Sequence, residues 1–205
     1  MRRFILWSIA LCLLALAPLF LRSYTLYILN LAGVYVVATL GLNLLTGYTG
    51  QLSIGHAGFL AIGAYAGALL PAKLGIPFWL SIPLAGIVSG LAGFVLLIPA
   101  LRLTAIYLAI ATLGFGAAVA EILPRWTAVT GGYQGMKVPK AALFGLTLDS
   151  DVKLYYLALV IVIVMILLAQ NIVGSKMGRA FVAIRDQERA AQALGISLTR
   201  YKAYA

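Results

Sequence analysis

The chain has 205 residues, of which 63% are hydrophobic and 10% are charged, and its mean hydropathy is +1.05. A soluble domain of this length cannot bury so much apolar surface, whereas a lipid bilayer can, so the composition excludes a soluble globular domain and predicts an all-α, polytopic transmembrane helix bundle. The net charge of +10 does not indicate a nucleic-acid partner, because the cations lie at the ends of apolar runs rather than together on a soluble face.

Six apolar runs are long enough to cross a membrane, for which about 20 apolar residues are needed. They lie at about 4–21, 24–45, 52–70, 77–101, 104–123 and 153–172. The first run has the outline of a signal peptide, with Ala15-Leu16-Ala17 in place of a cleavage site, but Pro18 makes cleavage after Ala17 unfavourable. We therefore predict that this run is retained as a helix.

Positive charge predicts the orientation, since Lys and Arg are enriched in cytoplasmic loops. Two cations, Arg2 and Arg3, lie at the N-terminus. A dense group of cations lies in the polar stretch 174–202, which follows the sixth run. Six crossings put these two groups on the same side, so we predict that the N-terminus and the polar stretch are both cytoplasmic. Within the stretch, Arg185 to Gly195 are predicted to form one short amphipathic helix, ended by glycine, to which a soluble partner docks.

The most unusual internal segment runs from Leu42 to Gly58. It places Asn43, Gln51, Ser53 and the chain's single histidine, His56, among apolar neighbours, and its glycines argue against a continuous helix. Irregular backbone at membrane depth is tolerated only where protein covers it or where it lines a water-filled cavity. We predict that this broken, glycine-rich segment lines a translocation path. For His56, a neutral imidazole that packs and hydrogen-bonds between helices is the alternative.

A second glycine-rich sequence, Gly131-Gly132-Tyr133-Gln134-Gly135, lies in the long loop between the fifth and sixth runs. One interpretation is a turn whose glycines adopt positive φ. The other is a loop that folds back into the outer mouth of the path, since loops longer than about 15 residues are often functional. In the second interpretation, Gly131, Gly132 and Gln134 also line the path.

Sequence features of an enzyme are missing. The phosphate-binding pattern G-x-x-x-x-G-K-[ST] does not occur, so the chain is not itself an ATPase. One histidine and one cysteine cannot build a zinc site of the usual kind. Ser53 and His56 lie three residues apart but have no carboxylate nearby to complete a nucleophilic site. We predict no catalytic residue, no metal site and no cofactor.

Three segments, in this order along the chain, carry a resemblance to a known family. They are residues 42–59 (LNLLTGYTGQLSIGHAGF), 130–135 (TGGYQG) and 178–196 (GRAFVAIRDQERAAQALGI). The first is similar to the signature of the high-affinity branched-chain amino-acid ABC importer permeases, M-type subunit. The second resembles the T-G-G-x-x-G loop of that family, and the third resembles its cytoplasmic coupling segment.

The resemblance implies a permease subunit of an ATP-driven importer for branched-chain, aliphatic amino acids in a bacterial inner membrane. Its implied partners are a homologous second permease subunit, two cytoplasmic ATPase subunits that bind the ATP, an extracytoplasmic substrate-binding protein and the lipid bilayer. Coupling to the ATPases is assigned, by likeness, to Arg185, Asp186, Glu188, Arg189, Ala190, Ala191 and Gly195. The resemblance places the coupling helix itself at Glu188 to Gly195. Family members usually continue with further spans, so we expect residues 1–205 to form a single, C-terminally truncated transmembrane permease domain.

Two alternatives stay open. Relatives with nearly the same motifs carry urea or short amides. From a different class, an ion-coupled secondary transporter or channel needs ionisable residues within the membrane. The spans offer only His56 and Glu121, and Glu121 is predicted to form a structural ion pair with Arg125, four residues later.

Overall fold

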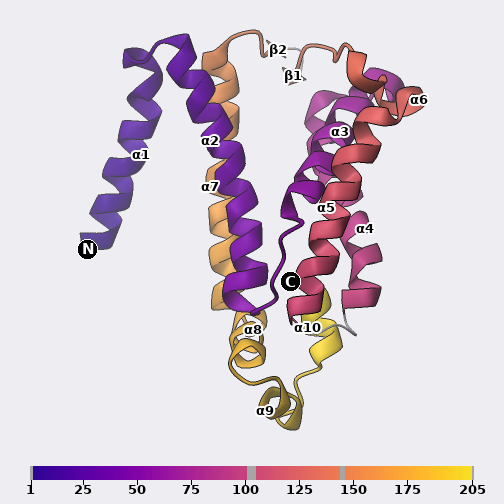
Figure 1. Ribbon diagram of the computed structural model, residues 1–205. Coiled ribbons are helices and arrows are strands. Elements are labelled where there is room, and N and C mark those ends of the chain that lie inside the picture. Colours follow the sequence, from indigo (N-terminus) through magenta and orange to yellow (C-terminus); the bar gives the residue numbers. More distant parts are fainter. Residues whose placement is uncertain (1, 101–104, 144–145, 205) are drawn as a thin grey trace.

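The computed structural model describes the backbone of residues 2–100, 105–143 and 146–204 (Figure 1). Apart from one short hairpin, the described elements are helices, which confirms the all-α class. In chain order they are α1 (Arg2–Phe20), α2 (Ser23–Leu42), the π-helix η1 (Asn43–Tyr48), α3 (His56–Leu74), α4 (Phe78–Ala100), α5 (Ala105–Arg125), α6 (Thr127–Thr130), the 3-10 helix η2 (Gly132–Gln134), β1 (Ala142–Leu143), β2 (Leu146–Thr147), α7 (Asp151–Gly174), α8 (Lys176–Asp186), α9 (Glu188–Ala193) and α10 (Leu198–Tyr204).

Five of the described helices are long and apolar enough to cross a membrane. They are Ser23–Tyr48, which joins α2 to η1, and the segments His56–Leu74, Phe78–Leu97, Ile106–Arg125 and Asp151–Gly174. These helices correspond to the second to sixth predicted spans, of which the predicted ends at residues 101 and 104 lie outside the described residues. The first predicted span corresponds to α1, whose described apolar part is Leu11–Phe20.

The third predicted span begins at residue 52, whereas α3 begins only at His56. Gly50 has a φ of +72°, in the left-handed region that glycine adopts without strain. Gly55 lies so close to α5 that a Cβ on it would overlap the carbonyl oxygen of Thr112. The backbone between these two glycines is therefore irregular, as expected of the broken segment, and the helix begins a few residues after the approximate start of the predicted span.

The long helices form two groups that lie side by side (Figure 1). One group consists of α1, α2 and α7, the other of α3, α4 and α5, and residues 49–55 join them. The hydroxyl groups of Tyr155 and Tyr156 attach α7 to α1, since they donate hydrogen bonds to the carbonyl oxygens of Leu14 (2.8 Å) and Ala15 (3.0 Å). Helices α8, α9 and α10 lie at one end of the molecule, and α6 with the hairpin lies at the other (Figure 1).

Small residues bring α3 close to α4. A Cβ on Gly63 would lie 3.8 Å from Cβ of Ser89, and a Cβ on Gly67 would lie 3.7 Å from Cβ of Ala85. The hydroxyl of Ser89 also donates a hydrogen bond to the carbonyl oxygen of Phe59 (2.8 Å). Close approach of small faces is the usual way in which membrane helices pack, and it makes α3 and α4 one compact unit.

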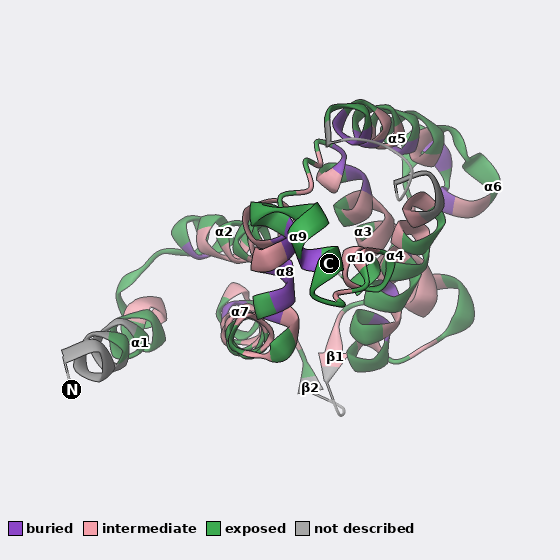
Figure 2. Cartoon of the chain, turned by 90° about the horizontal axis from the view of Figure 1, so that it is seen from below, coloured by how far each residue is buried: buried purple, intermediate pink, exposed green. Residues whose placement is uncertain are grey.

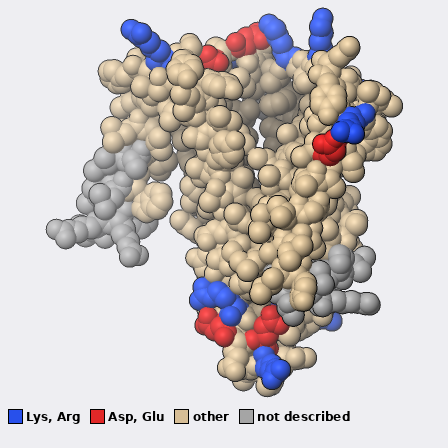
Figure 3. Space-filling model, in the orientation of Figure 1, with Lys and Arg blue, Asp and Glu red and all other residues tan. Residues whose placement is uncertain are grey.

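Charged side chains gather toward the two ends of the molecule and leave an uncharged belt between them (Figure 3). At the end that carries the hairpin, Lys140 pairs with Asp149 (3.2 Å), and hydrogen bonds from Thr147 and Lys140 lower the pKa of the Asp149 carboxyl. The opposite end carries the charges of α8, α9 and α10. Helix α1 begins near the middle of the molecule's long axis and runs toward the end that carries the hairpin (Figure 1).

Few described side chains are buried, and several of these belong to α8 (Figure 2). Phe181 and Ile184 are each 1% exposed. In contrast, many large apolar side chains of the long helices are exposed, as in the surface of a protein that contacts lipid. The tightest packing of apolar side chains outside the long helices therefore lies at the charged end with α8.

The contact of Gly55 with α5 gives a first prediction. Gly55→Ala should lower the stability of the protein by about 1–3 kcal/mol, because the added Cβ meets the backbone of Thr112 and cannot be accommodated without a shift of α5. Gly90→Ala in α4 is the matched control, since a Cβ at Gly90 meets no atom within 4 Å. Thermal unfolding in detergent compares the two variants, and equal unfolding temperatures would contradict the close contact.

Candidate functional site

The helix that begins as α2 ends in the wider turns of η1. After η1, the Gln51 N–H donates a hydrogen bond to the carbonyl oxygen of Leu45 (3.2 Å). Thr49 is 3% exposed, and its hydroxyl donates to the same carbonyl oxygen. π-Helical turns are rare and occur frequently at functional sites. The end of this long helix is therefore both distorted and well held.

Residues 50–55 form the irregular connection to α3. Outside a helix, their backbone groups need hydrogen-bond partners at membrane depth. The Ile54 N–H donates to the hydroxyl oxygen of Thr112 (3.0 Å), and that hydroxyl donates to the carbonyl oxygen of Ala109 (3.0 Å). Thr112 is 6% exposed. One buried threonine of α5 thus fixes the connection against the second group of helices.

A groove of about 890 Å³ runs along this connection. Helix α2 and η1 form one wall, and Leu52, Ser53 and Ile54 with Ala109 of α5 form the other. The lining is mostly apolar, with the polar residues Thr39, Asn43, Thr46 and Ser53 among aliphatic ones. An apolar hollow with a small number of polar groups is the usual form of a small-molecule site.

Two hydroxyl groups in the groove lack a partner within the described structure. The Thr46 Oγ1 and Ser53 Oγ atoms are buried and make no hydrogen bond there. Thr39 lies about two turns before Thr46 on the same wall. Its hydroxyl does have a partner, since it donates a hydrogen bond to the carbonyl oxygen of Tyr35 (2.7 Å). A buried polar group without a partner is costly. Thr46 and Ser53 are therefore the side chains best placed to bind a polar group that enters the groove.

The groove brings together part of the predicted path. Asn43 and Ser53 line it, whereas Gln51 and His56 are absent from its lining. Gln51 turns the other way, toward α10, where its Nε2 lies 3.5 Å from the carbonyl oxygen of Lys202. Thr46 also lines the groove but was not predicted from the sequence. Its spacing of three residues from Asn43 would have placed both on one helical face.

His56 is the first residue of α3 and lies between α3 and α2. A Cβ on Gly41 of α2 would lie 3.4 Å from both Cε1 and Nε2 of the imidazole. The ring also meets Phe59 edge-on, with ring centres 6.2 Å apart. These contacts are those of a packing residue between two helices, and the absence of His56 from the groove lining gives the path interpretation no support.

The second glycine-rich motif forms a fixed turn at the far end of α5. Gly131, Gly132 and Gly135 have φ values of +80°, +67° and +71°, as the turn interpretation predicts. Thr130 is 1% exposed, and its hydroxyl lies 2.8 Å from the Leu123 carbonyl oxygen and accepts from the Gly132 N–H at 3.2 Å.

The turn lies away from the groove. None of Gly131, Gly132 and Gln134 is among the residues that line it. The turn belongs to the end of the molecule opposite α8 to α10 (Figure 1). Glu121 and Arg125, near this end, form the predicted ion pair.

At the charged end, the predicted single helix from Arg185 to Gly195 is wrong. The extended residue Gln187 (φ −159°, ψ 103°) separates α8, which ends at Asp186, from α9, which begins at Glu188. Gly195 follows α9 with a φ of +83°, in agreement with the predicted glycine end.

Burial explains why the helix breaks. In a continuous helix, Glu188 would lie on the same stripe as Phe181 and Ile184, since residues three and four apart share a face. That stripe is almost fully buried, so the carboxylate would be buried with it. With the break, Glu188 pairs with Lys202 of α10 instead (2.7 Å).

Most of α9 faces outward. Ala191 is 2% exposed and anchors the helix. Leu194, the first residue after the end of α9, is 81% exposed. Arg189 and Ala190 are exposed as well. Arg185 and Asp186 instead belong to the end of α8, where they form an ion pair with each other (3.2 Å). The residues assigned to coupling therefore fall on two helices.

The described residues contain no group of three His, Cys, Asp or Glu side chains that could hold a metal ion. The candidate site is thus a groove with uncharged polar groups and, beside it, a charged end with one outward-facing short helix.

Comparison with known proteins gives consistent matches. The family model described as branched-chain amino acid transport system / permease component matches residues 24–205. The high-affinity branched-chain amino acid transport system permease protein LivM of Salmonella typhimurium LT2 is 38% identical over 96% of this chain, and that of Escherichia coli K12 is 37% identical over the same share. The chain spans about half of each relative, 52% of its length. No solved structure matches significantly.

Proposed function

We propose that this chain, which belongs to the branched-chain amino acid transport system / permease component family, forms part of the translocation path of an ATP-driven importer for branched-chain, aliphatic amino acids. The groove between η1 and the irregular connection is the observation that carries the proposal. Transporters typically bind their substrates where membrane helices are interrupted. The match to a permease family and the interruption of the helix at the groove both support this proposal.

The chemistry of the groove fits an aliphatic amino acid. Val36, Leu40 and Ile54 offer an apolar surface to a branched side chain. The unpaired hydroxyls of Thr46 and Ser53 can accept a hydrogen bond from an ammonium group and donate one to a carboxylate. Uncharged groups also suit a path, because a substrate must be able to leave its binding site again.

The alternatives fit less well. Urea and short amides have little apolar surface to place against the aliphatic wall of the groove. An ion-coupled carrier needs an ionisable residue that is free to change its charge within the membrane. Glu121 is paired with Arg125, and His56 packs against Gly41.

We further propose that α9 docks onto a cytoplasmic ATPase subunit. Its exposed Leu194, together with Ala190, offers a small apolar surface in water beside the membrane. In this arrangement the N-terminus and α8 to α10 face the cytoplasm of a bacterial inner membrane. Two ATPase subunits bind and hydrolyse the ATP, a homologous permease subunit completes the path, and an extracytoplasmic binding protein delivers the substrate.

The groove hydroxyls give a second prediction. Thr46→Val and Ser53→Ala should each raise the KM for leucine uptake by about 2- to 10-fold, since each removes one hydrogen bond to the substrate worth about 0.5–1.5 kcal/mol. Thr39→Val is the matched control, because the Thr39 hydroxyl is already bonded within its own helix. Uptake is measured in membrane vesicles that contain the complete transporter. A similar rise in KM for Thr39→Val would argue against a binding role.

The outward face of α9 gives a third prediction. Leu194→Asp should abolish co-purification of the ATPase subunits, because it places a charge in an apolar contact, while insertion into the membrane is unchanged. Thr199→Asp, at an exposed position of α10, is the control and should keep the complex intact. If Leu194→Asp retains the ATPase subunits, α9 is not their docking surface.

A further inference from the structure

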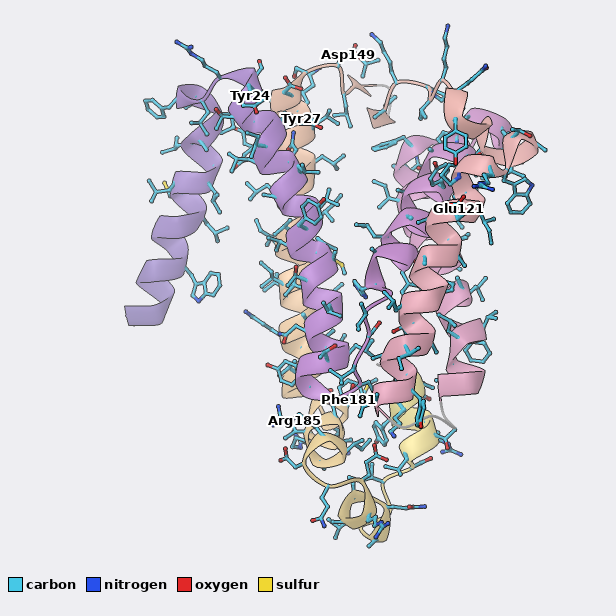
Figure 4. All side chains as sticks on the ribbon, viewed as in Figure 1. Tyr24, Tyr27, Glu121, Asp149, Phe181 and Arg185 are labelled. Carbon is cyan, nitrogen blue, oxygen red and sulfur yellow. The ribbon has the colours of Figure 1, made fainter. Side chains whose placement is uncertain are left out.

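The Arg185 side chain of α8 reaches into the irregular connection between α2 and α3. Its Nη1 donates a hydrogen bond to the carbonyl oxygen of Gly47 (2.9 Å). Its Nε and Nη2 both lie 3.2 Å from Oδ1 of Asp186. Figure 4 shows Arg185 beside Phe181, where α8 meets the end of the long helix that begins as α2. The guanidinium thus joins residues 138 positions apart in the chain.

Gly50 also lies against the Arg185 side chain. A Cβ on Gly50 would lie 2.9 Å from Cγ and 3.5 Å from Cβ of Arg185, so a side chain at Gly50 would collide with Cγ of the arginine. Its φ of +72° also favours glycine at this position. The backbone therefore contacts the Arg185 side chain at two places, Gly47 and Gly50.

A second, longer contact starts at Gln51, the residue after Gly50. Gln51 Nε2 lies 3.5 Å from the carbonyl oxygen of Lys202 in α10, and Lys202 pairs with Glu188 of α9 (2.7 Å). The two contacts therefore end on α8 and α10, the helices on either side of α9, which is proposed to dock onto the ATPase. Directly after Gln51, Leu52 begins the wall of the groove.

Buried side chains next to Arg185 hold α8 firmly against α10. Phe181 and Ile184, which precede Arg185, are each 1% exposed, and the Phe181 ring packs against Tyr201 of α10 with ring centres 6.4 Å apart. A displacement of α8 and α10 would carry Arg185 with it. Because Arg185 holds Gly47 and abuts Gly50, the groove wall two to four residues later would move too.

We propose that Arg185 is a positioning residue that transmits the displacement of the cytoplasmic helices to the translocation groove, with Gly50 as its contact. The inference rests on the proposed transport function. The resemblance had assigned Arg185 to coupling with the ATPases. Here Arg185 acts within this chain instead of touching an ATPase. Arg185 and the groove wall stay joined through the transport cycle and move together.

The test uses the complete transporter with its partner subunits, purified and reconstituted in proteoliposomes. Leucine uptake and ATP hydrolysis are measured together, and their ratio is compared between variants. Arg185→Gln should lower the leucine transported per ATP about tenfold, as expected when one charge-assisted hydrogen bond is lost, while ATPase co-purification and hydrolysis are retained. Arg185→Lys keeps a donor that can reach the Gly47 carbonyl oxygen, and it should restore most of the ratio.

Arg179→Gln is the matched control, because Arg179 is an exposed arginine of the same helix α8 whose side chain contacts the nearby Gly174 carbonyl oxygen (3.5 Å). It should leave the uptake per ATP unchanged in complexes that retain their ATPase subunits. An unchanged ratio in Arg185→Gln would overturn the inference. So would loss of the ATPase subunits from Arg185→Gln, since Arg185 would then act at the docking surface. If the unsubstituted transporter shows no ATP-dependent leucine uptake, the proposed function itself fails.

A cysteine pair provides a second measurement that does not depend on the stability of Arg185→Gln. In a Cys12→Ser background, Gly50→Cys and Arg185→Cys would place two Cβ atoms 3.5 Å apart, a separation that permits a disulfide. The reduced form lacks the arginine and should have a low uptake per ATP. Oxidation joins the same two segments covalently and should raise the ratio. If oxidation instead stops uptake, the segments separate during the cycle and the inference is wrong.

Discussion

Every backbone N–H and C=O group at membrane depth needs a hydrogen-bond partner, because lipid supplies none. The chain gives up helical hydrogen bonds between Tyr48 and His56, and side chains from other elements replace some of them. Thr112 of α5 accepts from the Ile54 N–H, and Arg185 of α8 donates to the Gly47 carbonyl oxygen. The connection therefore depends on parts of the chain that lie on both sides of it.

This constraint also determines where the molecule can change shape. Helices α3 and α4 are held together by small residues, and Gly55 and Gly58 press the start of α3 against α5. Helix α8 is held by its buried stripe. The groove wall lies between these two firm units and is anchored to each of them. In the proposed transmission of movement through Arg185, a relative displacement of the units would therefore change the groove more than either unit.

Charge and burial divide the segment 185–202 into parts with different surroundings. The break at Gln187 keeps the Glu188 carboxylate out of the buried stripe and lets it pair with Lys202. It also turns α9 outward, so that Leu194 is exposed while Ala191 anchors the helix. Arg185, three residues before Glu188, donates a hydrogen bond to the carbonyl oxygen of Gly47, which lines the groove. One short stretch of sequence thus supplies both the outward surface proposed for docking and an inward contact with Gly47.

Local pattern determined the fold class, the approximate positions of the apolar helices, the broken segment and the left-handed glycines of the turn at 131–135. Each of these follows from the residues within one segment, through hydropathy, charge or the steric freedom of glycine. Only the tertiary structure decided that Ser53 and the overlooked Thr46 line the groove while Gln51 turns toward α10, that the helix breaks at Gln187 and that Arg185 binds Gly47. Those outcomes depend on neighbours up to 151 positions away in the chain, which no local pattern encodes.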